Sequence, residues 1–298
     1  MADTHLPDPR VTLPPLRPEY LCDTIATADI GVVQKPLTLW QRLANQAWLR
    51  KAFILCVIAA GWQLYAMHLN NPLLVPTFTA TLEAFQAGVV SGDIPEKVVN
   101  SVVLLLKGYL LGLALAMFFT ALAMMSRLGN DLLETLTSAF NPLPAIALLP
   151  LALLWFGLGD ISIIFVLVHS VLWAVALNTH SGFRSVSNTL RMVGRNYGLR
   201  GPRFIVQILI PAAFPSILTG LKIGWAFAWR TLIAAELVFG VSSGKGGLGW
   251  YINENKNMLD IPAVFAGLLT VIMIGLVVEN LIFRNIEAAT VRKWGMQT

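Results

Sequence analysis

The sequence predicts an all-α membrane protein with about six transmembrane helices, on three observations. Of 298 residues, 56% are hydrophobic and only 12% are charged, whereas soluble domains carry about 25% charged residues. The mean hydropathy is +0.68. The apolar residues come in blocks of roughly 18 to 27, long enough to cross a bilayer core of about 30 Å. Such a chain has too little polar surface for an ordinary soluble domain.

The predicted elements follow in order along the chain. A polar, proline-containing segment, residues 1–50, reads as a flexible tail. Residues 51–96 hold the first span and an outer segment, residues 97–284 form a core domain with five further spans, and residues 285–298 form a C-terminal tail. The six predicted spans cover about residues 52–69, 98–125, 132–156, 161–178, 213–239 and 263–283.

Loop charge predicts that both termini are cytoplasmic, because short loops rich in Lys and Arg stay on that side. The loop between the fourth and fifth spans has no acidic residue and holds Arg184, Arg191, Arg195, Arg200 and Arg203. The net charge of +5 therefore reflects loop orientation and does not indicate a nucleic-acid partner. Two cysteines in unlike surroundings, Cys22 and Cys56, do not predict a disulfide or a metal site.

The third predicted span is interrupted by proline. It contains the run Asn141-Pro142-Leu143-Pro144, and proline removes backbone donors and bends or breaks a helix. Irregular backbone at membrane depth must be buried in protein or line a cavity. Pro142 and Pro144 thus mark either a translocation path or a packing kink, and the sequence leaves both interpretations open.

The loop at about residues 179–212 has helical signals of its own. Ser187 can cap a short amphipathic helix that runs to Tyr197, and Gly198 supplies a left-handed stop. Gly201-Pro202 then begins a second segment, which Pro211 is expected to close. Two short helices with five arginines form either a platform for another protein or a pair lying on anionic lipid.

Several motifs resemble a known family, the binding-protein-dependent importer permeases. Gly198 and Pro211 resemble the glycine and proline of that family's conserved cytoplasmic loop. The stretch IPAAFPSILTGLK, residues 210–222, resembles the nitrate/sulfonate/taurine branch. Further matches are PLPAIALLP (142–150), LWFGLG (154–159), NT (178–179), GFRSV (182–186) and AAE (234–236). The resemblance covers about residues 97–280, with the motifs in the family's order.

The resemblance implies a type I ABC importer permease fold with a cytoplasmic coupling-helix loop. It implies the membrane-spanning subunit of an ATP-driven importer, which forms the path for a small anion such as nitrate, a sulfonate or taurine. The implied partners are two ATP-binding cassette ATPase subunits, a second permease subunit (commonly a homodimer in this branch) and an extracytoplasmic solute-binding protein. The implied location is a bacterial-type plasma (inner) membrane. ATP hydrolysis would belong to the separate ATPase, so neither an enzyme nor a cofactor is expected here.

One departure from the family concerns the coupling loop. Where the family usually has Glu-Ala-Ala, this chain has Met192-Val193-Gly194, and methionine cannot accept hydrogen bonds as a carboxylate does. Arg191 and Arg195 are candidates to compensate by pairing with acidic residues of a partner. The candidate ATPase-coupling residues are Arg191, Met192, Val193, Gly194, Arg195, Gly198, Arg200 and Pro211.

Charged residues inside the fifth span are the remaining candidates. Such residues usually face the bundle interior or a water-filled cavity. Arg230 either attracts an anionic substrate or forms an internal ion pair or reaches the outer interface, and Glu236 is either a gate or a structural partner. Lys222 is interpreted as an anchor and the single His169 as a packing residue. The translocation-path candidates are Pro142, Pro144, Arg230 and Glu236.

A stand-alone secondary transporter or channel is the alternative function. Secondary carriers commonly have repeated halves with broken helices in both, and residues 52–156 and 161–283 offer no matching pair. The Gly-rich run at 244–249 lacks the spacing of a phosphate-binding loop and is predicted to be a flexible outer turn.

Overall fold

The computed structural model describes residues 46–239, 246–293 and 295. Every regular element within these residues is helical, which confirms the all-α class. The predicted tail at 1–50 lies largely outside the described residues, as do the first residues of the Gly-rich run. Contacts divide the chain into residues 1–56 and 57–298, and the packing described below lies within the second unit.

The number of candidate spans agrees with the prediction of about six. Five helical stretches are long and apolar enough to cross a membrane: Ala47–Leu69, Asp93–Met125, Asp160–Ser185, Ile205–Val238 and Ile261–Arg292. The pair Arg127–Phe140 and Ala145–Phe156 adds a sixth when it is counted as one bent span.

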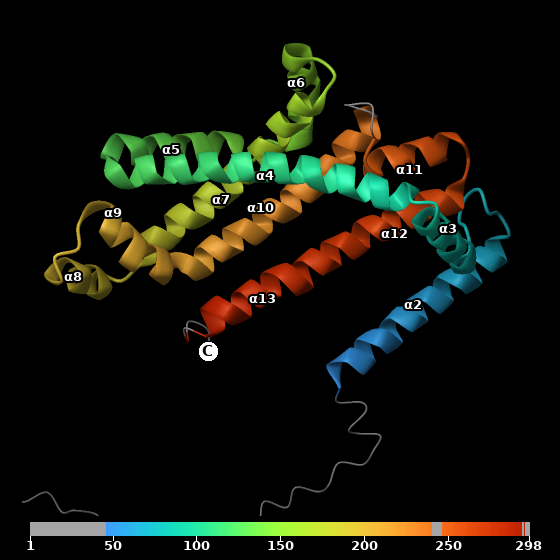
Figure 1. The fold of residues 1–298 in the computed structure, drawn as a ribbon, viewed down its shortest axis with the longest axis horizontal. Coiled ribbons are helices and arrows are strands. Elements are labelled where there is room, and N and C mark those ends of the chain that lie inside the picture. The colour runs from blue at the N-terminus through green and yellow to red at the C-terminus, as the bar shows by residue number, and fades with distance from the viewer. Residues whose placement is uncertain (1–45, 240–245, 294, 296–298) are drawn as a thin grey trace, which may run out of the picture. The chain divides into compact units, whose positions relative to one another are not determined.

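Helix α7 (Asp160–Ser185) is the centre of the core. Helices α4 (Asp93–Met125) and α10 (Ile210–Phe239) both pack along it (Figure 1). Apolar side chains over most of its length are buried, with Val166, Leu167 and Val171 fully covered. A helix that is apolar all round is stable at such a position because neighbouring helices cover every face.

Two pairs of glycines allow α4 and α10 to approach α7 closely. Gly108 and Gly112 of α4 face α7, where an added Cβ would come within 2.6 Å of Leu167 and 2.8 Å of Val171. Gly220 and Gly224 of α10 also face α7, and an added Cβ at either position would press against residues of α7. Both pairs have the G-x-x-x-G spacing that lets membrane helices pack backbone to backbone. Our sequence interpretation did not use this pattern.

The predicted break in the third span is confirmed. Helix α5 (Arg127–Phe140) ends before the proline run, and η1 (Ala145–Leu148) with α6 (Leu149–Phe156) resumes at 88° to it. The bend is at Asn141-Pro142-Leu143-Pro144, where prolines cannot supply helical hydrogen bonds.

Two shorter helices were not predicted. Helix α3 (Phe78–Val90) begins at the Thr77 cap, whose hydroxyl accepts from the Ala80 N–H, and follows α2 (Ala47–Leu69). Helix α11 (Leu248–Asn257) begins inside the Gly-rich run, so Leu248 and Gly249 are helical and not part of a turn. It packs against α10 and against α12 (Ile261–Val277).

The loop between the fourth and fifth spans is shorter than expected. Helix α7 continues to Ser185, because Gly182 packs against Ser216 and Phe183 is buried against α10 and its approach. The expectation that Pro211 closes a separate segment is wrong. Helices α9 (Gly201–Phe204), η2 (Ile205–Leu209) and α10 follow one another without a break, and Pro211 is the second residue of α10, directly after the wider turns of η2.

The C-terminal segment is helical through Arg292, in η3 (Val278–Phe283), α13 (Arg284–Glu287) and η4 (Ala288–Arg292). Lys222 of α10 forms an ion pair with Glu287 of α13, with Nζ and Oε2 2.6 Å apart. The pair is only partly exposed, so Lys222 joins two helices of the bundle. This contact is more specific than the anchoring that the sequence suggested.

Candidate functional site

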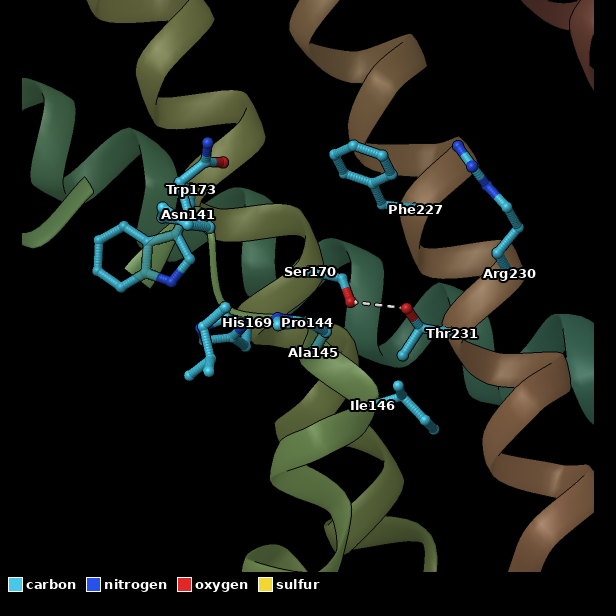
Figure 2. Close-up of a pocket in the computed structure, with 12 residues that line it drawn as sticks. Asn141, Pro144, Ala145, Ile146, His169, Ser170, Trp173, Phe227, Arg230 and Thr231 are labelled. Carbon is cyan, nitrogen blue, oxygen red and sulfur yellow. Dashed lines mark hydrogen bonds between the residues drawn. The ribbon is translucent and has the colours of Figure 1, made fainter. Parts of the chain in front are cut away.

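The bend in the third span meets α7 and α10 at an open pocket of about 270 Å³. The pocket is lined by residues 141–146, by His169, Ser170 and Trp173 of α7, and by Phe227, Arg230 and Thr231 of α10 (Figure 2). Three of the four translocation-path candidates, Pro142, Pro144 and Arg230, are therefore brought together.

Arg230 is the cation of this pocket. Its side chain is exposed, its Nε donates to the Ala226 carbonyl at 2.9 Å, and its guanidinium carbon lies 5.2 Å from the centre of the Phe227 ring. Among the described residues no carboxylate lies within ion-pair distance of it. Arg230 therefore keeps donors available to an anion, and the internal ion pair considered from the sequence is not formed among these residues.

The wall of the pocket on α7 holds nitrogen atoms without partners. Both ring nitrogens of His169 and the Nε1 of Trp173 are buried and have no hydrogen-bond partner among the described residues. Trp173 as a whole is only 7% exposed. Buried polar groups are normally paired, so these three atoms are exceptions among the described residues. The sequence did not single out Trp173 or Phe227, because each occurs within an apolar run.

A hydroxyl pair joins the two helices at the pocket. Ser170 Oγ of α7 and Thr231 Oγ1 of α10 are 3.1 Å apart (Figure 2). This contact links the two walls directly, so a movement of α7 against α10 would change the pocket.

Glu236, the fourth candidate, does not line this pocket. It is 3% exposed, and its carboxylate accepts from the Ser101 hydroxyl at 2.8–2.9 Å and from the Gly249 N–H at 2.8 Å. Ser101 in turn accepts from the Leu248 N–H at 2.8 Å. Helix α11 has no side-chain cap of its own, so Ser101 and Glu236 pair two of its free N–H groups. The geometry corresponds to the structural partner considered from the sequence.

The short helix α8 (Asn188–Asn196), which lies in the loop between the fourth and fifth spans, has the predicted caps. Ser187 Oγ accepts from the Leu190 N–H, and Gly198 has φ of +75° with its N–H bonded to the Arg195 carbonyl at 2.9 Å. This left-handed conformation is the stop that the sequence predicted.

Helix α8 contacts the end of α7 and the residues that lead into α10, and both of these helices line the pocket. The Arg191 guanidinium donates to the carbonyls of Phe183 and Val186 at the end of α7. Gly194 is buried against Phe204 and Ile208, which lead into α10, and an added Cβ there would lie 2.8 Å from the Phe204 ring. Arg191 is therefore engaged within the chain, which makes it a weaker candidate for pairing with a partner than the exposed Arg195 or Arg200.

The outer face of α8 exposes apolar side chains. Val193 is 41% exposed and Tyr197, just after the helix, is 81% exposed, and Met192 is also exposed. Pro211, grouped with this loop from the sequence, lies instead inside the continuous helix. The remaining coupling candidates stay together on or beside α8.

A valine at Gly198 is expected to open the end of α8. A β-branched residue at positive φ costs roughly 1–2 kcal/mol, a factor of about 5–30 in an opening equilibrium. Trypsin cleavage at Arg195 and Arg200 in the detergent-purified chain should accelerate by about that factor. Gly198→Asn is the control, because asparagine tolerates this conformation and should leave the cleavage rate near wild type. Equal rates for the two variants would contradict the assignment.

Comparison with known proteins identifies the family. The model of the binding-protein-dependent transport system inner membrane component family matches residues 108–290. A Methanocaldococcus jannaschii protein named as an ABC transporter permease is 32% identical over 223 residues, covering 74% of this chain and 82% of that protein.

Two further relatives carry substrate names. The taurine transport system permease protein of Escherichia coli is 27% identical, covering 80% of this chain and 86% of its own length. The nitrate import permease protein of Synechocystis is 31% identical over 53% of this chain and 56% of its own. Together with the helical fold, the proline bend and the capped loop, the family match means that this chain belongs to the binding-protein-dependent transport system inner membrane components, the permease subunits of ABC transporters.

Proposed function

We propose that this chain is the transmembrane subunit of an ATP-driven importer, which passes a small anion received from an extracytoplasmic binding protein. The observation that carries the proposal is helix α8, which exposes apolar side chains, is hydrogen-bonded to the end of α7 and packs on residues that lead into α10. An exposed apolar face on a short loop helix is suited to docking on another protein. A separate ATPase is the partner that the family's mechanism requires.

The contacts of α8 suggest how such a partner acts on the path. A force on α8 reaches the end of α7 through Arg191 and reaches α10 through the packing of Gly194 on Phe204. These two helices line the pocket that contains Arg230. Closure of an ATPase pair against α8 would therefore change the spacing of the pocket walls, which is the coupling an importer needs.

The proposed assembly has two permease subunits, two ATP-binding cassette ATPase subunits and one binding protein. We place the chain in a bacterial-type inner membrane with both termini in the cytoplasm, because the basic residues gather in the α8 loop and beside the first and last spans. ATP hydrolysis is assigned to the partner. The anionic class of substrate is supported by Arg230, which has no carboxylate partner among the described residues, and by the relatives named for taurine and nitrate.

Co-purification with ATPase activity tests this function. The tagged chain, extracted in mild detergent from cells that produce it natively, is expected to recover an ATP-hydrolysing partner. Val193→Asp should reduce that recovery at least about tenfold, because it places a charge in the apolar contact, and a loss of 1.4 kcal/mol is already tenfold. Asn196→Asp adds the same charge to the same helix without removing an apolar side chain, and should retain most of the partner.

Two outcomes would contradict the proposal. A chain that purifies without any ATPase and transports in vesicles without ATP would be a secondary transporter or channel. Recovery of the ATPase by Val193→Asp at the wild-type level would remove α8 from the contact and favour the alternative in which α8 lies on the lipid surface.

A further inference from the structure

We propose that the pocket formed by the bend, α7 and α10 selects an organic anion, a sulfonate or carboxylate attached to an apolar body, over a bare inorganic oxyanion such as nitrate. This inference rests on the proposed function, because it assigns a substrate class to the same path. Relatives of this chain are named for an organic sulfonate, taurine, and for an inorganic anion, nitrate, and the proposal assigns the first class to this pocket.

The pocket contains a positive charge that can bind one anionic group of a ligand. Arg230 supplies a permanent positive charge beside the Phe227 ring, and within the described part of the chain no carboxylate neutralises it. The donor Trp173 Nε1 and both ring nitrogens of His169, which donate or accept according to tautomer, are buried and have no partner among the described residues. Oxygens of a sulfonate or carboxylate would pair with the Arg230 guanidinium.

Apart from Asn141, Ser170 and Thr231, the rest of the pocket is apolar, and it is large compared with a small inorganic ion. Its walls include Pro142, Leu143, Pro144 and Ile146, together with the Phe227 ring, which is 42% exposed. The volume of about 270 Å³ is many times the ~30 Å³ that one water occupies in the liquid. Nitrate would leave most of these walls in contact with water, whereas the hydrocarbon part of an organic anion would cover them. Burial of that apolar surface is favourable and adds to the affinity.

The Phe227 ring and the Arg230 guanidinium are placed to bind a ligand that has an apolar body at one end and an anionic group at the other. Phe227 and Arg230 lie one turn apart on α10, and both reach the pocket (Figure 2). An apolar body against the ring places an attached sulfonate within reach of the guanidinium. Substitutions at these two positions are therefore expected to have different effects on the two classes of ligand.

Binding to the purified, detergent-solubilised full chain, without binding protein or ATPase, tests the selection. The probes are sodium nitrate, methanesulfonate, butanesulfonate and benzenesulfonate, measured by isothermal titration calorimetry. We expect Kd to fall along the sulfonate series and to be at least about tenfold lower for benzenesulfonate than for nitrate. Phe227→Ala should raise the Kd for benzenesulfonate about tenfold and leave nitrate unchanged, while Arg230→Gln should weaken every anion.

Matched controls separate the pocket from general effects. Phe118→Ala removes an exposed ring from α4, and Lys107→Gln removes an exposed cation from the same helix; neither residue lines the pocket. Both should bind like wild type, and thermal unfolding checks that Phe227→Ala and Arg230→Gln fold, since both side chains are exposed.

The selection is overturned if nitrate binds as tightly as benzenesulfonate, if no probe binds, or if sulfonate binding is insensitive to Phe227→Ala. These outcomes are independent of the ATPase experiment. Selective binding without a recovered ATPase would support ligand selection by the pocket and contradict the importer function. A recovered ATPase without selective binding would support the importer function and contradict the selection.

Discussion

Replacing Gly108 by leucine is expected to prevent α4 from packing on α7 and to cause a large loss of folded protein. Even a Cβ at this position would lie 2.6 Å from Leu167 Cβ and 2.8 Å from its Cδ1, closer than real contacts allow. Leu167 is fully buried, and in a close-packed interior it can move only by displacing its neighbours. Overpacking a close-packed interior costs about 1–3 kcal/mol and sometimes more, and leucine adds three carbons beyond Cβ.

The same reasoning applies to Gly112, whose added Cβ would meet Val171 at 2.8 Å and the Val168 carbonyl at 3.3 Å. The measurement is the yield of monodisperse protein in detergent together with its thermal unfolding midpoint. Gly61→Leu is the matched control, because Gly61 lies in the candidate span α2 and an added Cβ there meets nothing within 4 Å. Wild-type stability of Gly108→Leu would show that the close α4–α7 contact does not exist in the membrane.

Replacing Glu236 by alanine is expected to destabilise the region where α4, α10 and α11 meet. The substitution leaves the Gly249 N–H without its acceptor and Ser101 without the carboxylate that it contacts. Each buried polar group left unpaired costs about 1–3 kcal/mol, so a loss of roughly 2–6 kcal/mol is expected for the two groups. Glu236→Gln should have an intermediate effect, because its amide keeps one acceptor but turns a donor toward a second donor.

The readout distinguishes a structural partner from a gate. Glu236→Ala should lower the thermal unfolding midpoint, and transport should fall in proportion to folded protein. Glu279→Ala removes an exposed carboxylate from another candidate span and should change neither quantity. A stable Glu236→Ala protein with impaired transport would instead place Glu236 on the path, as the sequence hypothesis allowed.

The elements predicted from the sequence are those encoded by local chemistry. Long apolar blocks gave the spans, because their length alone satisfies the bilayer. The break at Asn141–Pro144 followed from the missing donors of proline, and the ends of α8 followed from Ser187 and Gly198, whose preferences act within a few residues. Each signal lies within the element that it defines.

Two of the features that were missed, helix α11 and the end of α7, depend on residues far away in the sequence. Helix α11 carries no cap of its own and is completed by Ser101 and Glu236, which lie on α4 and α10. The continuation of α7 to Ser185 depends on the packing of Gly182 against Ser216 of α10. Neither contact leaves a local pattern to read.

Arg230 and Glu236 show most clearly which properties the sequence determines and which ones depend on the tertiary structure. The sequence by itself determined that the chain crosses the membrane about six times and that its fifth span carries both charges. Only the tertiary structure decided their surroundings: Arg230 reaches an open pocket beside the bend, and Glu236 is buried against α4 and α11. Six residues of helix rotate a side chain by about 240°, so the two charges point toward different neighbours, and packing determines which neighbours those are.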